Sequence, residues 1–313
     1  MKVLFVASGN GKVNTTTSFI KTQYKSLQSA GVDMCLYVIN GHGVLGYLKN
    51  VYSLRQRILE EQPDIVHAHY SLCGYVTTLA NIGLGKKVFV SILGSFRDKS
   101  KRAKLVAFFI RHIWDGALVK AQRTADELGV NVPVVPNGVN LSQFILMERQ
   151  MARTLTGMRD DKRYVLFITD PKRPEKNYAL AQAAMNILHQ DKQYADVVLQ
   201  VVNGVTHDKV VQYMCGGDVV LMTSLTEGSP NVIKEAMACN CRIVTTDCGD
   251  TPWLMEFVDG GFLCVPNTPD AVADNIKKAL TYSRQSNGRE VILQLGLTVE
   301  QVADKIINLY KKL

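Results

Sequence analysis

The sequence has no long uncharged apolar run. A helix that crosses a bilayer needs about 20 consecutive apolar residues, and no stretch of the 313 residues approaches that length. Apolar residues make up 47% of the chain and charged residues 20%, which is typical of a folded soluble protein. We therefore expect no transmembrane segment.

Metal-binding cysteine spacings are also missing. The seven cysteines include no C-x2-C pair, and the C-x-C pair of Cys239 and Cys241 has no second pair near it. We predict reduced thiols in the core, no bound metal and a cytoplasmic location. Since no aromatic-interleaved basic motif or recognition module occurs, nucleic acid is not an expected partner.

The length predicts two domains, because 313 residues exceed one ordinary core and fit two units of about 150 residues. Short apolar strands alternate with helix-length segments in both halves, which predicts the α/β class with two parallel sheets covered by helices. The run 143–163 follows no single periodicity, so we place the boundary there, between 1–145 and 146–297. The expected strands are 2–7, 32–39, 64–68, 87–93, 116–120, 132–135, 164–168, 197–202, 218–223, 242–245 and 261–265.

Two glutamates, Glu227 and Glu235, lie eight positions apart across the start of a predicted helix. Glu227 precedes the helix, and Glu235 lies inside it, facing away from its apolar set. A carboxylate accepts hydrogen bonds from two neighbouring hydroxyls, so one glutamate could bind the hydroxyls of a ribose and the other those of a hexose. The alternative is an ordinary capped helix with two solvated glutamates.

The helix start between the glutamates predicts an anion site. Ser229 is the expected N-cap and Pro230 the first helical residue, which leaves the N–H groups of Asn231 and Val232 directed out of the helix. These donors and the helix dipole favour a phosphate, and Gly228 lets a ligand approach the backbone closely. Together with the glutamates, this pattern is typical of a nucleotide-sugar site.

Basic residues form two clusters. Lys172, Arg173 and Lys176 follow a predicted strand, where they suit the neutralisation of a diphosphate; a solvated turn of mixed charge is the alternative. The second cluster, in 99–113, mixes basic and apolar residues and, with the net charge of +8, favours a helix on an anionic membrane surface. A core-facing helix with a solvated basic face is the competing interpretation.

Two histidines end a predicted strand. His67 and His69 alternate along it, so they point to the same face. Contact with an acceptor and structural hydrogen bonding both remain open for this pair.

Five segments carry a family resemblance. They are Ser224 to Ala238 with the two glutamates, Asp64 to His69, Val135 to Asn140, Lys172 to Asn177 and Gly9 to Gly11. In this order the chain resembles the retaining glycosyltransferases of family 4, which have the GT-B fold and an E-x7-E signature. The similarity runs from residue 3 to about residue 282.

The resemblance implies two Rossmann-like domains that face each other across a cleft. The N-terminal domain binds the acceptor, the C-terminal domain binds the donor, and a C-terminal helix within 298–313 crosses back to the first domain. The implied catalytic residues are Glu227, Lys176 and Arg173. The implied donor-binding residues are Glu235, Gly228, Ser229, Pro230, Asn231, Val232, Lys172, Gly9, Asn10 and Gly11. The implied acceptor or cleft residues are His67, His69, Ser95, Arg97 and Asn137.

Three departures from the family pattern accompany the resemblance. Asp170 and Pro171 replace the usual Gly-Arg before the basic loop, no histidine follows the fourth strand, and Asp250 and Trp253 alter the usual Gly-Gly-x-Pro-Glu. Which cation clamps the diphosphate and which residue of the N-terminal domain assists the reaction therefore stay open.

The predicted function is a retaining, metal-independent hexosyltransferase without a cofactor. It would move a sugar from a nucleoside diphosphate sugar of the UDP or GDP type to a glycan or lipid-linked acceptor. This chemistry serves cell-surface polysaccharide or glycolipid synthesis at the inner face of the cell membrane. The alternatives are a nucleotide-sugar epimerase and a non-catalytic GT-B scaffold or binding protein.

Overall fold

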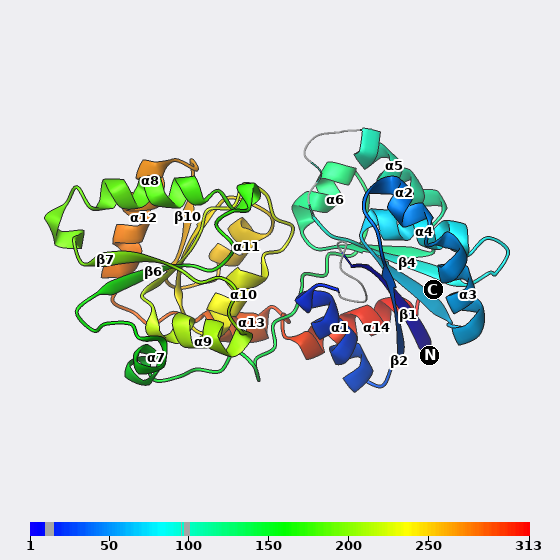
Figure 1. Cartoon of the computed structure of the whole chain (residues 1–313), viewed down its shortest axis with the longest axis horizontal. Coiled ribbons are helices and arrows are strands. Elements are labelled where there is room, and N and C mark those ends of the chain that lie inside the picture. The colour runs from blue at the N-terminus through cyan, green and yellow to red at the C-terminus, as the bar shows by residue number, and fades with distance from the viewer. Residues whose placement is uncertain (10–15, 95, 97–100) are drawn as a thin grey trace. The chain divides into compact units, whose positions relative to one another are not determined.

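The computed structural model describes residues 1–9, 16–94, 96 and 101–313. The chain divides into two compact units (Figure 1). Unit 1 comprises Met1–Gly138 and Val299–Leu313, and unit 2 comprises Val139–Thr298. Residues 139–145, which the sequence assigned to the first domain, belong to unit 2.

Within its described residues, unit 1 is built on a parallel sheet of five strands in the order β2-β1-β3-β4-β5. Alternate residues of β1 enter two different apolar clusters, so the sheet is buried on both faces. The strands are β1 (Lys2–Ser8), β2 (Asp33–Ile39), β3 (Ile65–His69), β4 (Lys87–Ile92) and β5 (Gly116–Val119).

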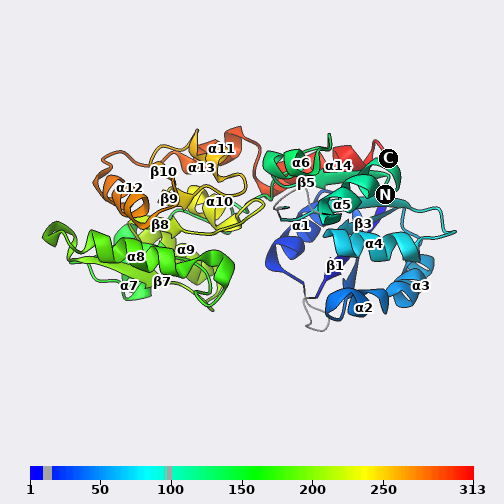
Figure 2. The same cartoon turned by 90° about the horizontal axis from the view of Figure 1, so that it is seen from above.

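The helices of unit 1 cover both faces of this sheet. The described helices are α1 (Ser18–Ser29), α2 (Gly43–Leu48), α3 (Val51–Glu61), α4 (Ser71–Ala80), α5 (Lys101–His112), α6 (Gln122–Leu128) and α14 (Val299–Tyr310). Helices α1 and α14 pack on one face, and α3 to α6 pack on the other. Helices α3 and α4 lie side by side in both views (Figures 1 and 2). The expected return of the C-terminal helix to the first unit is confirmed.

In the described chain, unit 2 repeats this plan with a five-stranded parallel sheet in the order β10-β9-β8-β6-β7. Val165 and Phe167 of β6 face one apolar cluster, and Tyr164 and Leu166 face the other. The strands are β6 (Arg163–Phe167), β7 (Val197–Val201), β8 (Val219–Met222), β9 (Arg242–Thr246) and β10 (Gly261–Cys264).

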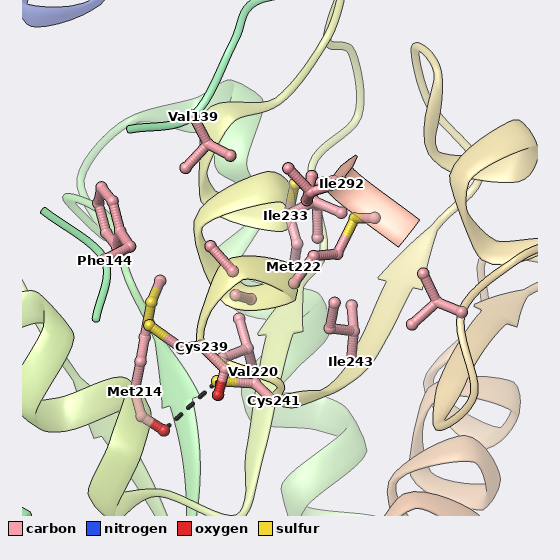
Figure 3. Close-up of a cluster of buried hydrophobic side chains, with 14 of the residues drawn as sticks. Val139, Phe144, Met214, Val220, Met222, Ile233, Cys239, Cys241, Ile243 and Ile292 are labelled. Atoms are coloured by element: carbon pink, nitrogen blue, oxygen red, sulfur yellow. Dashed lines mark hydrogen bonds between the residues drawn. The ribbon is translucent and has the colours of Figure 1, made fainter. Parts of the chain in front are cut away.

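Helices also cover both faces of the second sheet. The described α-helices are α7 (Arg149–Thr156), α8 (Tyr178–Leu188), α9 (His207–Gly216), α10 (Asn231–Ala238), α11 (Thr251–Met255), α12 (Pro269–Thr281) and α13 (Gly288–Gln294), with 3₁₀ turns η1 (Pro174–Lys176) and η2 (Lys192–Tyr194). Helices α8 and α12 share one face, and α9, α10, α11 and α13 contribute to the cluster on the other. Figure 3 shows part of the second cluster around Val220 and Ile233.

One strand expected from the sequence is not observed, and one helix lies in a run for which the sequence predicted no element. Residues 132–135 form no strand, because Val134 makes only an isolated bridge to Val119. The run 143–163 contains helix α7, which apolar periodicity did not reveal because this helix buries Arg153. The guanidinium of Arg153 is held by the carbonyls of Gly216, Arg159 and Lys162 and by the carboxylate of Asp218.

Candidate active site

Three loops of unit 2 meet beyond the carboxyl ends of neighbouring strands β6, β8 and β9. The N–H of Leu225 donates to the carbonyl of Glu175 at 2.8 Å, which joins the loops after β8 and β6. The hydroxyl of Thr246 donates to the carbonyl of Ser224 at 2.7 Å, which joins β9 to the loop after β8. Ligands of open parallel sheets bind at this edge.

A glycine makes the third contact possible. Gly249 has φ +60°, and a Cβ at this position would lie 2.4 Å from the carbonyl oxygen of Gly228. Since no L side chain tolerates such an approach, the loop after β9 can touch the glutamate loop only with glycine here.

Lys176 and Glu227 form the centre of this loop cluster. The Lys176 Nζ lies 2.5 Å from Glu227 Oε1, and the two side chains are 14% and 18% exposed. Turn η1 fixes this lysine, because the hydroxyl of Thr223 is hydrogen-bonded to the carbonyls of Lys176 and Asn177 at 3.0 Å each. The pair presents a cation and a carboxylate that a ligand can reach.

Arg173 and Lys172, the other two basic residues predicted for the site, do not contact Glu227 in the described structure. Arg173 is exposed and pairs with Glu175 at 2.5 Å. Lys172 is exposed, and its backbone N–H donates to Asp170 Oδ1 at 2.9 Å. Of the three basic residues, Lys176 is therefore the one that the structure brings to Glu227.

Glu235 lies on α10 and is partly buried rather than fully solvated. Burial raises the pKa of this carboxyl to about 7, and the neighbouring Lys234 opposes the rise. A carboxyl with such a pKa is poised between donor and acceptor of hydrogen bonds at neutral pH, which suits the recognition of hydroxyl groups.

The start of α10 differs from the sequence expectation. The helix begins at Asn231, Pro230 is the N-cap residue, and no side chain caps the helix. Ser229 was the expected cap, but its hydroxyl instead donates to Asp250 Oδ2 at 2.5 Å. The Ser229 hydroxyl therefore bonds to Asp250, 21 residues downstream, instead of capping its own helix.

Lys234 is a site residue that the sequence interpretation missed. Its side chain is 1% exposed, and its Nζ donates to Ser229 Oγ at 2.6 Å and to the Pro230 carbonyl at 3.3 Å, with Asp250 Oδ2 at 3.8 Å. Burial lowers the pKa of Lys234 and raises that of Asp250. The signal was present, since Lys234 lies three residues before Met237 on the buried side of the helix.

The buried cluster of Lys234, Ser229 and Asp250 joins the glutamate loop to the loop after β9. Asp250 Oδ1 is buried and has no hydrogen-bond partner among the described residues. A buried polar atom of this kind costs stability unless something pairs with it. Asp250 was noted in the sequence only as a departure from the family pattern, and the structure gives it this structural contact.

His67 and His69 of unit 1 are fully buried. His67 Nδ1 shares a hydrogen bond of 2.5 Å with the Tyr310 hydroxyl of α14, and its Nε2 shares one of 2.7 Å with Ser91 Oγ. Of the two interpretations left open for His67, structural hydrogen bonding is the one observed. His69 stacks on His67 with ring centroids 4.4 Å apart, and neither of its nitrogens has a hydrogen-bond partner among the described residues.

The remaining predicted residues are less informative. Gly9 is buried, and its N–H donates to the Ile39 carbonyl at 3.0 Å. Asn137 lines a small crevice of unit 1 beside α1 and α14. Asn10, Gly11, Ser95 and Arg97 lie outside the described residues.

No group of three or more histidine, cysteine, aspartate or glutamate side chains suited to a metal occurs among the described residues. No helix in the described ranges is long and apolar enough to span a membrane. The seven cysteines, all of them described, are free thiols. Five are buried as expected, but Cys35 and Cys215 are partly exposed.

Known glycosyltransferases resemble this chain in sequence and in fold. Residues 181–282 match the family model described as glycosyl transferases group 1. The solved structure of Anabaena HepE in complex with UDP superposes with a TM-score of 0.78 over 100% of both chains at 16% identity. The fold is GT-B.

Two curated relatives are glycosyltransferases by name. The yeast phosphatidylinositol N-acetylglucosaminyltransferase GPI3 subunit (Saccharomyces cerevisiae) is 43% identical over 112 residues, which is 36% of this chain and 23% of that protein. The putative teichuronic acid biosynthesis glycosyltransferase TuaC of Bacillus subtilis is 26% identical over 252 residues, which is 72% of this chain and 63% of that protein. The chain thus spans less than two thirds of either relative.

Proposed function

We propose that this protein is a retaining glycosyltransferase of family 4 that moves a hexose from a nucleoside diphosphate sugar to a glycan or lipid-linked acceptor. The observation that carries the proposal is the pair of Lys176 and Glu227, with Glu235 on the adjoining helix, in loops beyond the carboxyl ends of three adjacent strands. The segment that holds both glutamates lies within the region matched to the group 1 model. In this proposal unit 2 binds the donor and unit 1 binds the acceptor.

Each residue of the pair has a distinct role. On donor binding the Lys176 ammonium leaves its 2.5 Å pairing with Glu227 and neutralises the diphosphate. Glu227 is then free to accept hydroxyls of the donor sugar. Glu235, whose pKa is raised to about 7, binds the ribose hydroxyls.

The diphosphate is the leaving group. Lys176 and the backbone at the start of α10 stabilise the charge that develops on it, without a cofactor. The leaving diphosphate accepts the proton of the acceptor hydroxyl on the same face of the sugar, which retains the anomeric configuration. The residues here supply position and charge rather than a covalent nucleophile.

UDP is the first donor nucleotide to test. Anabaena HepE, whose fold this chain shares, was solved with UDP and with UDP-glucose. The names of GPI3 and TuaC refer to phosphatidylinositol and to teichuronic acid, so we propose an acceptor in glycolipid or cell-surface polysaccharide synthesis.

Calorimetric titration with UDP, GDP and ADP, with and without EDTA, tests the donor site. We expect one nucleotide to bind at micromolar affinity whether or not EDTA is present. Glu235→Gln and Lys176→Ala should weaken it by at least tenfold, whereas the exposed Glu256→Gln should leave it unchanged. A protein that binds none of the three nucleotides would instead be a scaffold. Turnover of the sugar nucleotide without an acceptor would indicate an epimerase or a hydrolase.

We further propose that α5 contacts anionic membranes. The helix carries basic residues at 101, 102, 104 and 111 and no acidic residue. Among them Leu105 and Phe108 are 47% and 50% exposed, while Ala103, Val106 and Ala107 pack against the core. Exposed apolar side chains set among cations suit insertion at the boundary between headgroups and acyl chains. This contact would place the enzyme beside a lipid-linked acceptor at the inner face of the cell membrane.

Cosedimentation with vesicles tests this contact. The protein should bind vesicles that contain phosphatidylglycerol and ignore vesicles of phosphatidylcholine alone. Leu105→Ser with Phe108→Ser should abolish binding, whereas Leu293→Ser, at an equally exposed position of unit 2, should not. Equal binding by both variants would refute the assignment to α5.

A further inference from the structure

A cavity of about 250 Å³ lies in unit 2 at the edge opposite the candidate active site. Its lining includes Asp218, which directly precedes β8, and Arg242, the first residue of β9. The glutamate loop follows the other end of β8. The two sites therefore lie at opposite ends of this strand, and nothing in the proposed transferase mechanism uses the cavity.

Three cysteines line this cavity: Cys215, Cys239 and Cys241. Cys215 belongs to the last turn of α9 and is partly exposed, whereas Cys239 follows α10 and is buried. The thiol of Cys215 donates to the carbonyl of Ile145 at 3.7 Å, and Cys215 and Cys239, which line the same cavity, shift each other's pKa. The thiol of Cys241 is engaged with the backbone, since it donates to the carbonyl of Met214 at 3.3 Å (Figure 3).

The charge around the cavity favours a thiolate. Arg242 and Arg284 line it, and neither forms an ion pair within the described ranges. The neighbouring Cys239 thiol and the backbone N–H of Met147 lower the pKa of the Cys215 thiol to about 7, although burial opposes the change. Nucleophilic cysteines occur in such electropositive, partly exposed settings.

Cys35 provides the contrast within the same chain. It is the other partly exposed cysteine, but its thiol donates to Glu61 Oε2 at 3.1 Å. Burial and this carboxylate raise the pKa of Cys35 to about 11. Exposure alone therefore does not make a cysteine of this protein reactive.

We propose that Cys215 and Cys239 form a reversible oxidation site. Hydroperoxides oxidise the two thiols, which then form a disulfide with each other. The Cys215 thiolate attacks hydrogen peroxide, which breaks the O–O bond and gives a sulfenic acid and water after proton transfer. The Cys239 sulfur then attacks the sulfenic sulfur and releases a second water. Two thiols lose two electrons and two protons, hydrogen peroxide is reduced to two waters, and one S–S bond forms.

The disulfide would enclose the segment that carries both glutamates. Residues 215–239 contain β8, Glu227, the start of α10 and Glu235. A crosslink between the ends of this segment restricts its unfolded states and so stabilises unit 2. The inference goes beyond the proposed function, because it holds whatever ligand the glutamates bind.

Mass spectrometry of the full chain tests the proposal. The protein is treated with hydrogen peroxide at neutral pH, free thiols are blocked with N-ethylmaleimide, and peptides are analysed without reduction. We expect a linked peptide pair that joins Cys215 to Cys239 and disappears after dithiothreitol. It should be absent from Cys215→Ser and Cys239→Ser and present in the matched control Cys35→Ser.

Thermal unfolding gives a second readout. In a Trp114→Phe background Trp253 reports on unit 2, because the chain has two tryptophans. Oxidation should raise the unfolding midpoint of this reporter by several degrees, and Cys215→Ser, at a partly exposed position, should remove the shift. The proposal is overturned if Cys215 reaches the sulfinic acid without a linked peptide, or if it links to Cys241 instead. An unchanged or lowered midpoint in the crosslinked protein would refute the stabilising effect.

Discussion

The two units place polar side chains at the same edge of similar sheets but at different depths. In unit 1, His67 and His69 belong to strand β3 itself and are fully buried between the helix layers. In unit 2, Lys176 and Glu227 lie in loops beyond β6 and β8 and remain partly exposed. A sheet covered on both faces buries what its strands carry, so a ligand can reach the residues just past the strand end.

The same contrast appears in the protonation of the two units. Burial lowers the pKa of His67 and His69, that of His69 to about 3, and keeps both histidines neutral. Burial raises the pKa of Glu235 to about 7. The first effect makes unit 1 sensitive to acid, and the second makes unit 2 less stable as the pH rises.

The largest expected effect comes from Lys234→Met, which tests whether unit 2 depends on a buried charge cluster. The change leaves Asp250 and Ser229 buried without their cation, so the free energy of unfolding should fall by about 4 kcal/mol. Urea unfolding followed by Trp253 measures it, and the exposed Lys278→Met is the control. Adding Asp250→Asn should restore part of the loss, and a Lys234→Met protein as stable as wild type would refute the role of the cluster.

Acid should destabilise unit 1 between pH 7 and pH 4, by about 3 kcal/mol from His69 alone and further through His67. The folded pKa values of His67 and His69 lie below the unfolded value, so the unfolded chain binds more protons in this range and stability is lost as pH falls. Urea unfolding followed by Trp114 in a Trp253→Phe background measures the dependence. His69→Gln should weaken it and His112→Gln, at an exposed position, should not. An unchanged slope in His69→Gln would contradict the assignment.

Glu235 should give the stability of unit 2 a pH dependence of the opposite sign. Its folded pKa of about 7 exceeds the unfolded value, so the folded chain binds more protons and stability falls as pH rises from about 5 to 8. We expect a loss on the order of 2 kcal/mol from this group. Glu235→Gln should remove it when unfolding is followed by Trp253, whereas Glu256→Gln should retain it. A pH dependence that survives in Glu235→Gln would place the titration elsewhere.

The smallest effect should come from Tyr310→Phe in unit 1. Removing the hydroxyl leaves His67 Nδ1 buried without its 2.5 Å partner, which costs about 1 kcal/mol. Nucleotide affinity should stay at the wild-type value, because the residue serves the fold. Denaturation and calorimetry on the same variant measure both quantities, and a large loss of affinity would give this part of unit 1 a functional role.

The sequence predicted ten of the observed strands because buried parallel strands are short apolar runs that local composition reveals. The sequence did not reveal helix α7, because a buried arginine interrupts its apolar pattern. It also predicted a strand at 132–135, where the apolar residues add no strand to the sheet. Lys176, Glu227 and Glu235 were predicted as residues of one donor site, and the structure brings the first two into contact. Lys234 was missed because a single lysine on a helix is usually solvated.

The sequence by itself therefore determined the α/β class, the two sheets and the loops that hold the candidate site, since each follows from residues close together in the chain. Tertiary structure alone decided which partner each polar group takes. Ser229 pairs with Asp250 rather than with its own helix, Lys176 with Glu227 across 51 positions, and His67 with Tyr310 across 243. Such choices depend on burial and on long-range contacts, because removing a polar group from water is favourable only where the fold supplies its partner.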